Sequence, residues 1–149
     1  MKLSRKVAVN APPDALWALL SDFSRAAKCL PGVKELNKLE DNKYSGILEA
    51  GVGPVKINLK GLATLAMDEA QKRTTMTAEA NDIRVGGGVK AVLSMQLISV
   101  SPTQSELQLD TEVTLMGRLG EMGQPIIKMK ANSIVKEFAE NLSKELKKK

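Results

Sequence analysis

The C-terminal segment, residues 117–149, reads GRLGEMGQPIIKMKANSIVKEFAENLSKELKKK and decides how the rest of the chain must be arranged. Its apolar residues recur at spacings of three and four, which places them on one face of an α-helix. These residues are Ile127, Ala131, Ile134, Val135, Phe138, Leu142 and Leu146. A helix from about Gln124 to Leu146 would be about 35 Å long. Such a helix needs a broad apolar surface, which the preceding chain must provide.

Alternating apolar and polar residues between Val33 and Met116 predict a series of strands that could form this surface. The longest alternation places Val55, Ile57, Leu59, Gly61, Ala63, Leu65 and Met67 on one face. Gly46 and Gly51 suggest bulges in the strand Tyr44–Val52. Three consecutive glycines predict a flexible loop over Asn81–Gly88.

The N-terminal part predicts a strand over Lys2–Val9, followed by short helices over Ala15–Leu20 and Ser24–Leu30. Asp22 is placed to cap the second helix. Arg5 falls on the apolar side of the strand, so it either lies at the rim or pairs with a carboxylate. The whole order predicts one α+β domain over residues 1–149, with a curved antiparallel seven-stranded sheet around the long helix.

The composition excludes several function classes. The chain has no His, which removes His-based acid–base catalysis and most zinc sites, and its single cysteine, Cys29, suits a reducing compartment. Four aromatic residues are too few for stacking single-stranded nucleic acid. The N-terminus lacks a signal-peptide core, so we expect a cytoplasmic protein. The basic C-terminus either contacts anionic membrane as a peripheral protein or is a solvated tail.

Glycine-rich stretches and paired carboxylates offer no clear catalytic or cofactor site. The glycines at 117, 120 and 123 lack the spacing of a dinucleotide fingerprint. Asp110 and Glu112 share an outward strand face, which favours solvation over catalysis. Pro125 either kinks a helix that begins near Arg118 or fits the first turn of one that begins near Gly123, and we favour the second. We therefore predict no catalytic residues, no metal site and no cofactor.

A set of short motifs narrows the fold class. Leu30-Pro31-Gly32-Val33 follows the two short helices, and Tyr44-x-Gly46 precedes Val52-Gly53-Pro54-Val55. The remaining motifs are Lys60-Gly61, Gly117-x-Leu119, Gly123, Ile126-Ile127 and Phe138. In this order the chain resembles the carbon monoxide dehydrogenase CoxG-like family. That family belongs to the START/SRPBCC helix-grip superfamily, which also contains polyketide cyclase-like proteins.

The resemblance implies a helix-grip fold with an internal apolar cavity and no established catalytic centre. Family members are often associated with molybdenum-containing CO dehydrogenase, connect enzyme and membrane, and handle lipophilic quinones. Many carry a C-terminal extension that reaches the membrane, whereas this sequence stops at its lysines.

Small residues on the inward strand faces fit such a cavity, because they leave space beneath the long helix. They include Gly46, Ala50, Gly61, Ala63, Ala78, Ala80 and Ala91. The alternative is that they let the helix pack closer, with no void. Met122, Ile126 and Met129 widen the apolar arc at the start of the helix. We expect them to close the cavity mouth opposite the glycine loop, although deeper burial of this end is the other interpretation.

Three functions remain in competition. The first is non-enzymatic binding of a lipid or quinone by a carrier or accessory protein of a CO dehydrogenase-type or other membrane-linked redox system. The second is a helix-grip enzyme, and the third is an assembly protein with a filled core. For the first function we predict the ligand-binding residues Ile57, Leu59, Gly61, Leu65, Met76, Ala78, Ala91, Leu93, Met95, Leu109, Val113, Met122, Ile126 and Met129.

Overall fold

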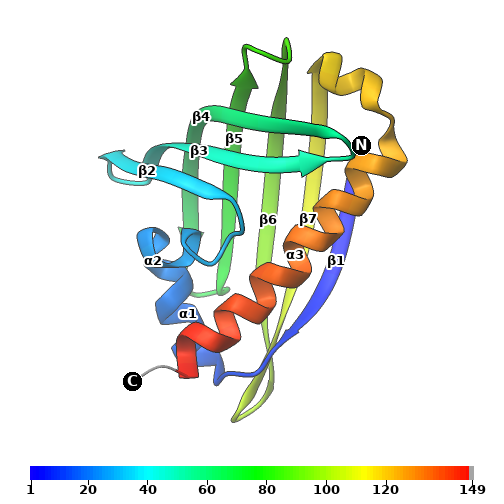
Figure 1. Ribbon diagram of the computed structural model, residues 1–149. Coiled ribbons are helices and arrows are strands. Elements are labelled where there is room, and N and C mark those ends of the chain that lie inside the picture. The colour runs from blue at the N-terminus through cyan, green and yellow to red at the C-terminus, as the bar shows by residue number, and fades with distance from the viewer. Residues whose placement is uncertain (148–149) are drawn as a thin grey trace.

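The computed structural model describes residues 1–147 and confirms the α+β class, with one antiparallel sheet and a long C-terminal helix (Figure 1). The seven strands lie in the order β1-β7-β6-β5-β4-β3-β2. They are β1 (Lys2–Val9), β2 (Val33–Glu40), β3 (Lys43–Val52), β4 (Val55–Asp68), β5 (Arg73–Asp82), β6 (Gly87–Ser101) and β7 (Gln104–Gly117). Neighbours in sequence from β2 to β7 are neighbours in the sheet, and β1 pairs with β7.

The helices begin where turn and capping residues predict. Pro13 opens α1 (Pro13–Ser21), and the Asp22 carboxylate accepts a hydrogen bond from the Arg25 N–H at 3.4 Å at the start of α2 (Phe23–Ala27). A 3₁₀ helix, η1 (Arg118–Met122), precedes α3 (Gln124–Lys147). Pro125 therefore lies in the first turn of α3, as predicted, where its missing N–H leaves no hydrogen bond unmade.

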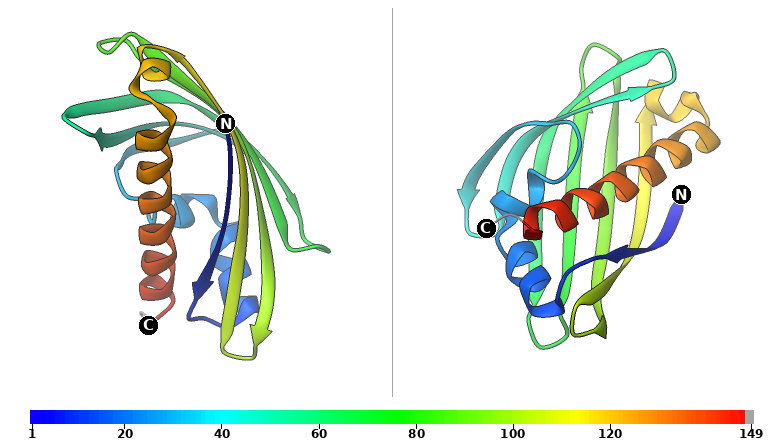
Figure 2. Two further views of the ribbon diagram at one scale, coloured as in Figure 1. Left: turned by 90° about the vertical axis from the view of Figure 1, so that its right-hand side faces the viewer. Right: turned by 60° about the horizontal axis from the view of Figure 1, so that its bottom comes forward.

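The sheet curves around α3, which lies on its concave side (Figure 2). The main neighbour of α3 is the edge strand β1, and it also contacts α1, β3 and η1. The middle strands β4, β5 and β6 are not among its main neighbours. The helix is therefore supported near its ends and along one edge of the sheet.

The apolar core is divided into two clusters, one at the C-terminal half of α3 and one at its start. The larger one joins α1, α2, the lower parts of β6 and β7, and the C-terminal half of α3, through residues such as Leu16, Leu107 and Leu142. The smaller one joins the β3–β4 turn, η1 and the start of α3 around Val52, Ile57 and Leu119. The residues midway along the concave face belong to neither cluster.

Two local predictions were wrong. The pairing of β3 with β4 is continuous from Lys43↔Thr64 to Val52↔Val55, so Gly46 and Gly51 form no bulge there; the register shifts lie between β2 and β3. A Cβ on Gly46 would lie 2.8 Å from the Glu35 carbonyl oxygen, so close strand approach requires this glycine. Nothing in the structure explains Gly51, whose Cβ would meet open space.

The glycine-rich loop is much shorter than predicted. β5 continues to Asp82 and β6 begins at Gly87, which leaves a turn of residues 83–86 instead of a loop over Asn81–Gly88. A Cβ on Gly87 would lie 2.8 Å from the Leu119 nitrogen, because η1 packs directly against this strand. Gly87 therefore serves close packing and not loop flexibility.

Arg5 lies on the exposed rim of the sheet, paired across β1 and β7 with Leu109. In the part of the chain that the structure describes, it forms no salt bridge. Of the two alternatives left open by the sequence, the structure supports the rim position.

Candidate functional site

Small residues line the middle of the concave face, in a region that α3 spans. Two adjacent rows of paired residues form its floor, running across β3 to β6. One row is Gly46, Gly61 and Ala80, and the other is Ala63, Ala78 and Ala91. Because adjacent strands are about 4.8 Å apart, each row spans about 10 Å. We call this region, with Ala131 and Ile134 on the apolar stripe of α3, the central hollow.

All six floor residues are only half-buried, although α3 lies on the same side of the sheet. Alanines beneath a helix packed directly on a sheet would be fully buried, since interiors are close-packed. Ala131 and Ile134 are also half-buried. The alanines of the floor therefore keep some contact with solvent, which a helix packed directly on them would remove.

The glycines and the alanines of the floor differ in the reason for their small size. A Cβ on Gly61 would collide with the Glu79 carbonyl and the backbone of Ala80, so the approach of β4 to β5 requires this glycine. Gly46 is explained in the same way by β2. The alanines have no such constraint, and they carry the evidence for space beneath the helix.

The predicted ligand-binding residues fall into three groups. Ile57, Leu65 and Leu109 are buried, at 3%, 5% and 5% exposure. The half-buried residues are Leu59, Gly61, Met76, Ala78, Ala91, Leu93, Met95, Val113 and Met122. Of these half-buried residues, Gly61, Met76, Ala78, Ala91 and Val113 belong to neither core cluster. The structure thus places this subset around the central hollow.

Ile126 and Met129 form the third group, and for them the expectation of a buried wide arc was wrong. Ile126 is 47% exposed and Met129 is 73% exposed. Leu119 of η1, at 1% exposure, is buried at this end of α3, in the same cluster as Ile127. The start of α3 therefore buries one stripe only. The expected proximity to the glycine turn does hold, because Val85, Met122 and Ile127 share the smaller cluster.

Two hydroxyl-bearing residues lie on the concave face, and Thr74 was not assigned to the site from sequence. Thr74 is 6% exposed, and its Oγ1 has no hydrogen-bond partner among the described residues. Tyr44 pairs with Ala63 in the floor row, and its ring contacts Phe23 with centroids 4.6 Å apart. Alternation places Thr74 on the inward face, but only the structure shows that its hydroxyl lacks a partner.

At the upper end of the hollow, Asp82 organises the turn between β5 and β6. Its Oδ2 accepts from the Asn58 N–H at 2.8 Å, and its Oδ1 accepts from the N–H groups of Arg84 at 2.9 Å and Val85 at 3.2 Å. The Asn58 hydrogen bond is the main reason that the pKa of Asp82 is lowered, while burial opposes the effect. The hydrogen bonds of this carboxylate therefore stabilise the turn.

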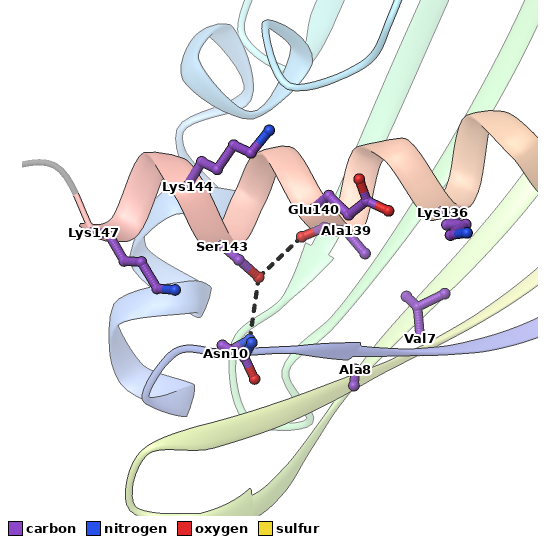
Figure 3. A pocket seen from close by; sticks show the side chains of 9 residues that line it. All are labelled: Val7, Ala8, Asn10, Lys136, Ala139, Glu140, Ser143, Lys144 and Lys147. Atoms are coloured by element: carbon purple, nitrogen blue, oxygen red, sulfur yellow. Dashed lines mark hydrogen bonds between the residues drawn. The ribbon is translucent and has the colours of Figure 1, made fainter.

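Surface grooves lie at other places, and one of them includes Gly46 and Gly61 of the central hollow. One of about 420 Å³ separates β1 from the C-terminal half of α3, where the Ser143 hydroxyl accepts from the Asn10 N–H at 3.1 Å and donates to the Ala139 carbonyl (Figure 3). Two more, of about 400 and 630 Å³, lie beside Ile47 and beside Pro12. Lysine side chains line part of the first groove, so its edge is polar.

The side chains considered for catalysis are dispersed. Asp110 accepts a hydrogen bond from the Ser4 hydroxyl at 2.7 Å on the outer face, and Cys29 is buried in the larger cluster. Within residues 1–147, no group of three His, Cys, Asp or Glu side chains could hold a metal ion. No helix of this part of the chain is long and apolar enough to cross a bilayer.

A long C-terminal helix gripped by a curved antiparallel sheet defines the START/polyketide cyclase-like class of helix-grip proteins. The profile of the carbon monoxide dehydrogenase CoxG family matches residues 6–147, so the chain belongs to the CoxG family. No curated protein sequence matches the chain.

Solved structures support the same class at low sequence identity. A conserved protein from Geobacillus kaustophilus has a TM-score of 0.88 at 18% identity, covering 98% of this chain and 95% of its own. A START superfamily protein from Mycobacterium smegmatis has a TM-score of 0.72 at 16% identity, covering 97% and 96%. The Zhui aromatase/cyclase from Streptomyces sp. R1128 has a TM-score of 0.69 at 13% identity, covering 98% and 93%.

Proposed function

We propose that this protein binds a lipophilic small molecule, a lipid or a quinone, in the central hollow without transforming it chemically. It would serve as a carrier or accessory protein of a CO dehydrogenase-type or other membrane-linked redox system. The single observation that carries the proposal is the row of half-exposed alanines beneath α3, between two separate core clusters.

The chemistry of the hollow supports an apolar ligand. Its floor and its helix side present only glycine, alanine and isoleucine, and its borders add Met76 and Val113. An apolar ligand would displace water from these surfaces, which stabilises the complex by about 25 cal/mol per Å² of apolar area removed from water. Membership of the CoxG family supports the redox association.

Absence of turnover is part of the proposal. The sequence has no His to act as a general base near neutral pH. The hydroxyls of Tyr44 and Thr74 could orient a polar group of the ligand, because both residues lie on the concave face. Without a His beside them, the two residues suit recognition of a carbonyl or hydroxyl group better than proton transfer.

Filling the hollow provides the test. Ala78→Phe would place a ring in the middle of the floor, whereas Ala66→Phe places the same ring on the exposed outer face of β4 as a matched control. Binding is measured by titration with decylubiquinone, with quenching of the single Trp17 as the signal. We expect Ala78→Phe to weaken binding about tenfold or more by occupying the site, with an unchanged or raised melting temperature.

The melting temperature distinguishes a ligand-binding site from a close-packed core. If the middle of the molecule were close-packed, Ala78→Phe would destabilise it by about 1–3 kcal/mol through overpacking. Native mass spectrometry of the purified parent offers a second measurement, in which a retained lipid- or quinone-sized adduct supports the proposal. Equal decylubiquinone binding by the parent and by Ala78→Phe would contradict it.

A further inference from the structure

One end of the molecule exposes large apolar side chains that the fold does not use. Ile83, at the tip of the β5–β6 turn, is 94% exposed, and Met129 and Ile126 on α3 are 73% and 47% exposed. The other exposed large apolar residues of the described chain are scattered over the sheet and the β6–β7 end: Leu39, Leu62, Val92 and Val100. Ile83, Ile126 and Met129 instead lie on the β5–β6 turn and the first turns of α3, whose segments pack in one cluster.

The β5–β6 turn and η1, which leads into α3, lie at the same end of the molecule (Figures 1 and 2). The Arg118 N–H donates to the Gly86 carbonyl at 3.1 Å, which joins η1 to the turn. Val85 of the turn packs in the same cluster as Met122 and Ile127. The exposed residues therefore project from an internally packed end. We call Ile83, Ile126 and Met129, with the segments that carry them, the apolar tip.

The charges around the apolar tip are predominantly positive. Arg84 follows Ile83, Arg118 begins η1, and Lys128 and Lys130 flank Met129. Within residues 1–147, none of these four cations forms a salt bridge. The nearby exposed carboxylate is Glu121, and the Asp82 carboxylate is occupied by backbone N–H groups. Arg118, Lys128 and Lys130 are therefore available to external anions, whereas Arg84 also acts on the Asp82 carboxylate, whose pKa it helps to lower.

We propose that the apolar tip docks on an anionic lipid bilayer. Ile83, Ile126 and Met129 would enter the boundary between headgroups and acyl chains, while Arg84, Arg118 and Lys128 bind lipid phosphates. A fluid surface fits side chains that project from a turn tip and a helix, since it needs no matching pockets. The charge complementarity between the four cations and an anionic leaflet selects this partner.

This geometry separates the docking surface from the basic C-terminus. Lys144 is eighteen residues beyond Ile126 on the same helix, which corresponds to about 27 Å. This exceeds the Debye length of about 8 Å at physiological salt. With the apolar tip on a bilayer, Lys144 is therefore too far away to contribute. Of the C-terminal lysines considered from sequence, Lys148 and Lys149 lie outside the described residues.

Co-sedimentation with vesicles tests the proposal. The full chain is mixed with vesicles of phosphatidylcholine alone, or containing about 30% phosphatidylglycerol. The variant Ile83→Asp/Met129→Asp is compared with Val100→Asp, which places the same charge at another exposed apolar position, at the opposite end of β6. We expect the tip variant to lose binding to anionic vesicles by about tenfold or more, and the control to bind as the parent does.

Charge variants give a second comparison. Arg84→Gln/Lys128→Gln should reduce the preference for anionic vesicles, and Lys144→Gln/Lys147→Gln should leave it unchanged. The proposal is overturned if the parent does not bind anionic vesicles, or if the tip variant binds as the parent does. It is also overturned if the C-terminal pair controls binding. Unchanged melting temperatures confirm that each variant is folded.

Docking by the apolar tip uses surface residues, so it can fail independently of ligand binding. Decylubiquinone titration of the tip variant, without vesicles, measures the central hollow alone. Normal titration with lost co-sedimentation supports docking by the apolar tip. Normal co-sedimentation of a variant that cannot bind decylubiquinone, such as Ala78→Phe, shows that docking does not depend on the proposed ligand.

Discussion

Thr74 places a hydroxyl group on the concave face where the described part of the chain offers it no hydrogen-bond partner. A buried unsatisfied polar group costs about 1–3 kcal/mol of stability. Such a cost is often retained where a binding partner uses the group. Thr74 is therefore a residue at which stability and binding are expected to conflict.

The isosteric substitution Thr74→Val exposes this conflict. We expect the free energy of unfolding to rise by about 1 kcal/mol, because the unsatisfied hydroxyl is removed. Urea denaturation measures the change, with Thr77→Val on the outer face of β5 as the control. A loss of stability would show that the hydroxyl has a partner, such as a bound water. Weaker decylubiquinone binding by Thr74→Val would assign the hydroxyl to ligand recognition.

At the scale of single elements, α3 is held firmly at its C-terminal half and spans the sheet more loosely in its middle. Leu142 is fully buried at 0% exposure within the larger cluster. Ile134 lies on the same apolar stripe, but it is half-buried and belongs to neither cluster. The two positions distinguish support at the ends from packing along the whole helix.

Truncation at these positions should have unequal effects. Leu142→Ala is expected to destabilise the protein by about 2–5 kcal/mol, because it leaves a cavity in a packed core. Ile134→Ala should cost about 1 kcal/mol or less, since its side chain is incompletely removed from water. Chemical denaturation of both variants checks the difference. Equal losses would indicate that α3 packs directly on the sheet, with no hollow.

The β5–β6 turn depends on the ionised form of Asp82. Its pKa is held below the ordinary value of 3.8 by N–H groups of Asn58, Val85 and Arg84. The stabilising contribution is therefore fully present above the ordinary value and is lost as the pH falls through the lower pKa of the folded state. Asp82→Asn should be less stable than the parent near neutral pH and should lose less stability on acidification.

The dependence of the unfolding free energy on salt distinguishes Asp82 from a second carboxylate, Glu49. The pKa of Glu49 is also lowered, first by its hydrogen bond with Lys56, at 3.1 Å, and further by Lys34. That interaction is between solvent-accessible charges and is screened by salt. Free energies of unfolding measured from about pH 7 to pH 2 should therefore respond to salt less for Glu49→Gln than for the parent. The contribution of Asp82, which comes mainly from neutral backbone donors, should persist at high salt.

At the scale of the whole molecule, the order of elements and the inward face of nearly every strand follow from periodicity in the sequence. The alternation at Val55–Met67 and the three- and four-residue spacing in α3 are local patterns, and local patterns specify which side of an element is buried. The cap at Asp22 and the helix start beside Pro125 are also local, and both predictions agree with the structure.

Predictions that depended on distances between elements were less successful. Gly46 was interpreted as a bulge, but it permits close approach of β2, which no single strand reveals. Ile126 and Met129 were expected to close a cavity mouth or to be deeply buried, but both are exposed, because the sequence does not show which side of α3 meets the sheet at this end. Whether Ala78 and Ala91 face a packed helix or a gap depends on how far α3 lies from β5 and β6. That distance results from the packing of α1, β1 and η1 together.

The separation of the core into two clusters has a thermodynamic consequence. A protein with an unfilled middle removes less apolar surface from water when it folds than a solid protein of the same length, so its heat capacity of unfolding is smaller. A ligand that occupies the gap supplies the missing contacts and couples the two clusters. Its binding adds about 2.7 kcal/mol of stability at a free concentration one hundred times its dissociation constant. Cargo would then act as part of the core, and the loaded protein would unfold more cooperatively than the empty one.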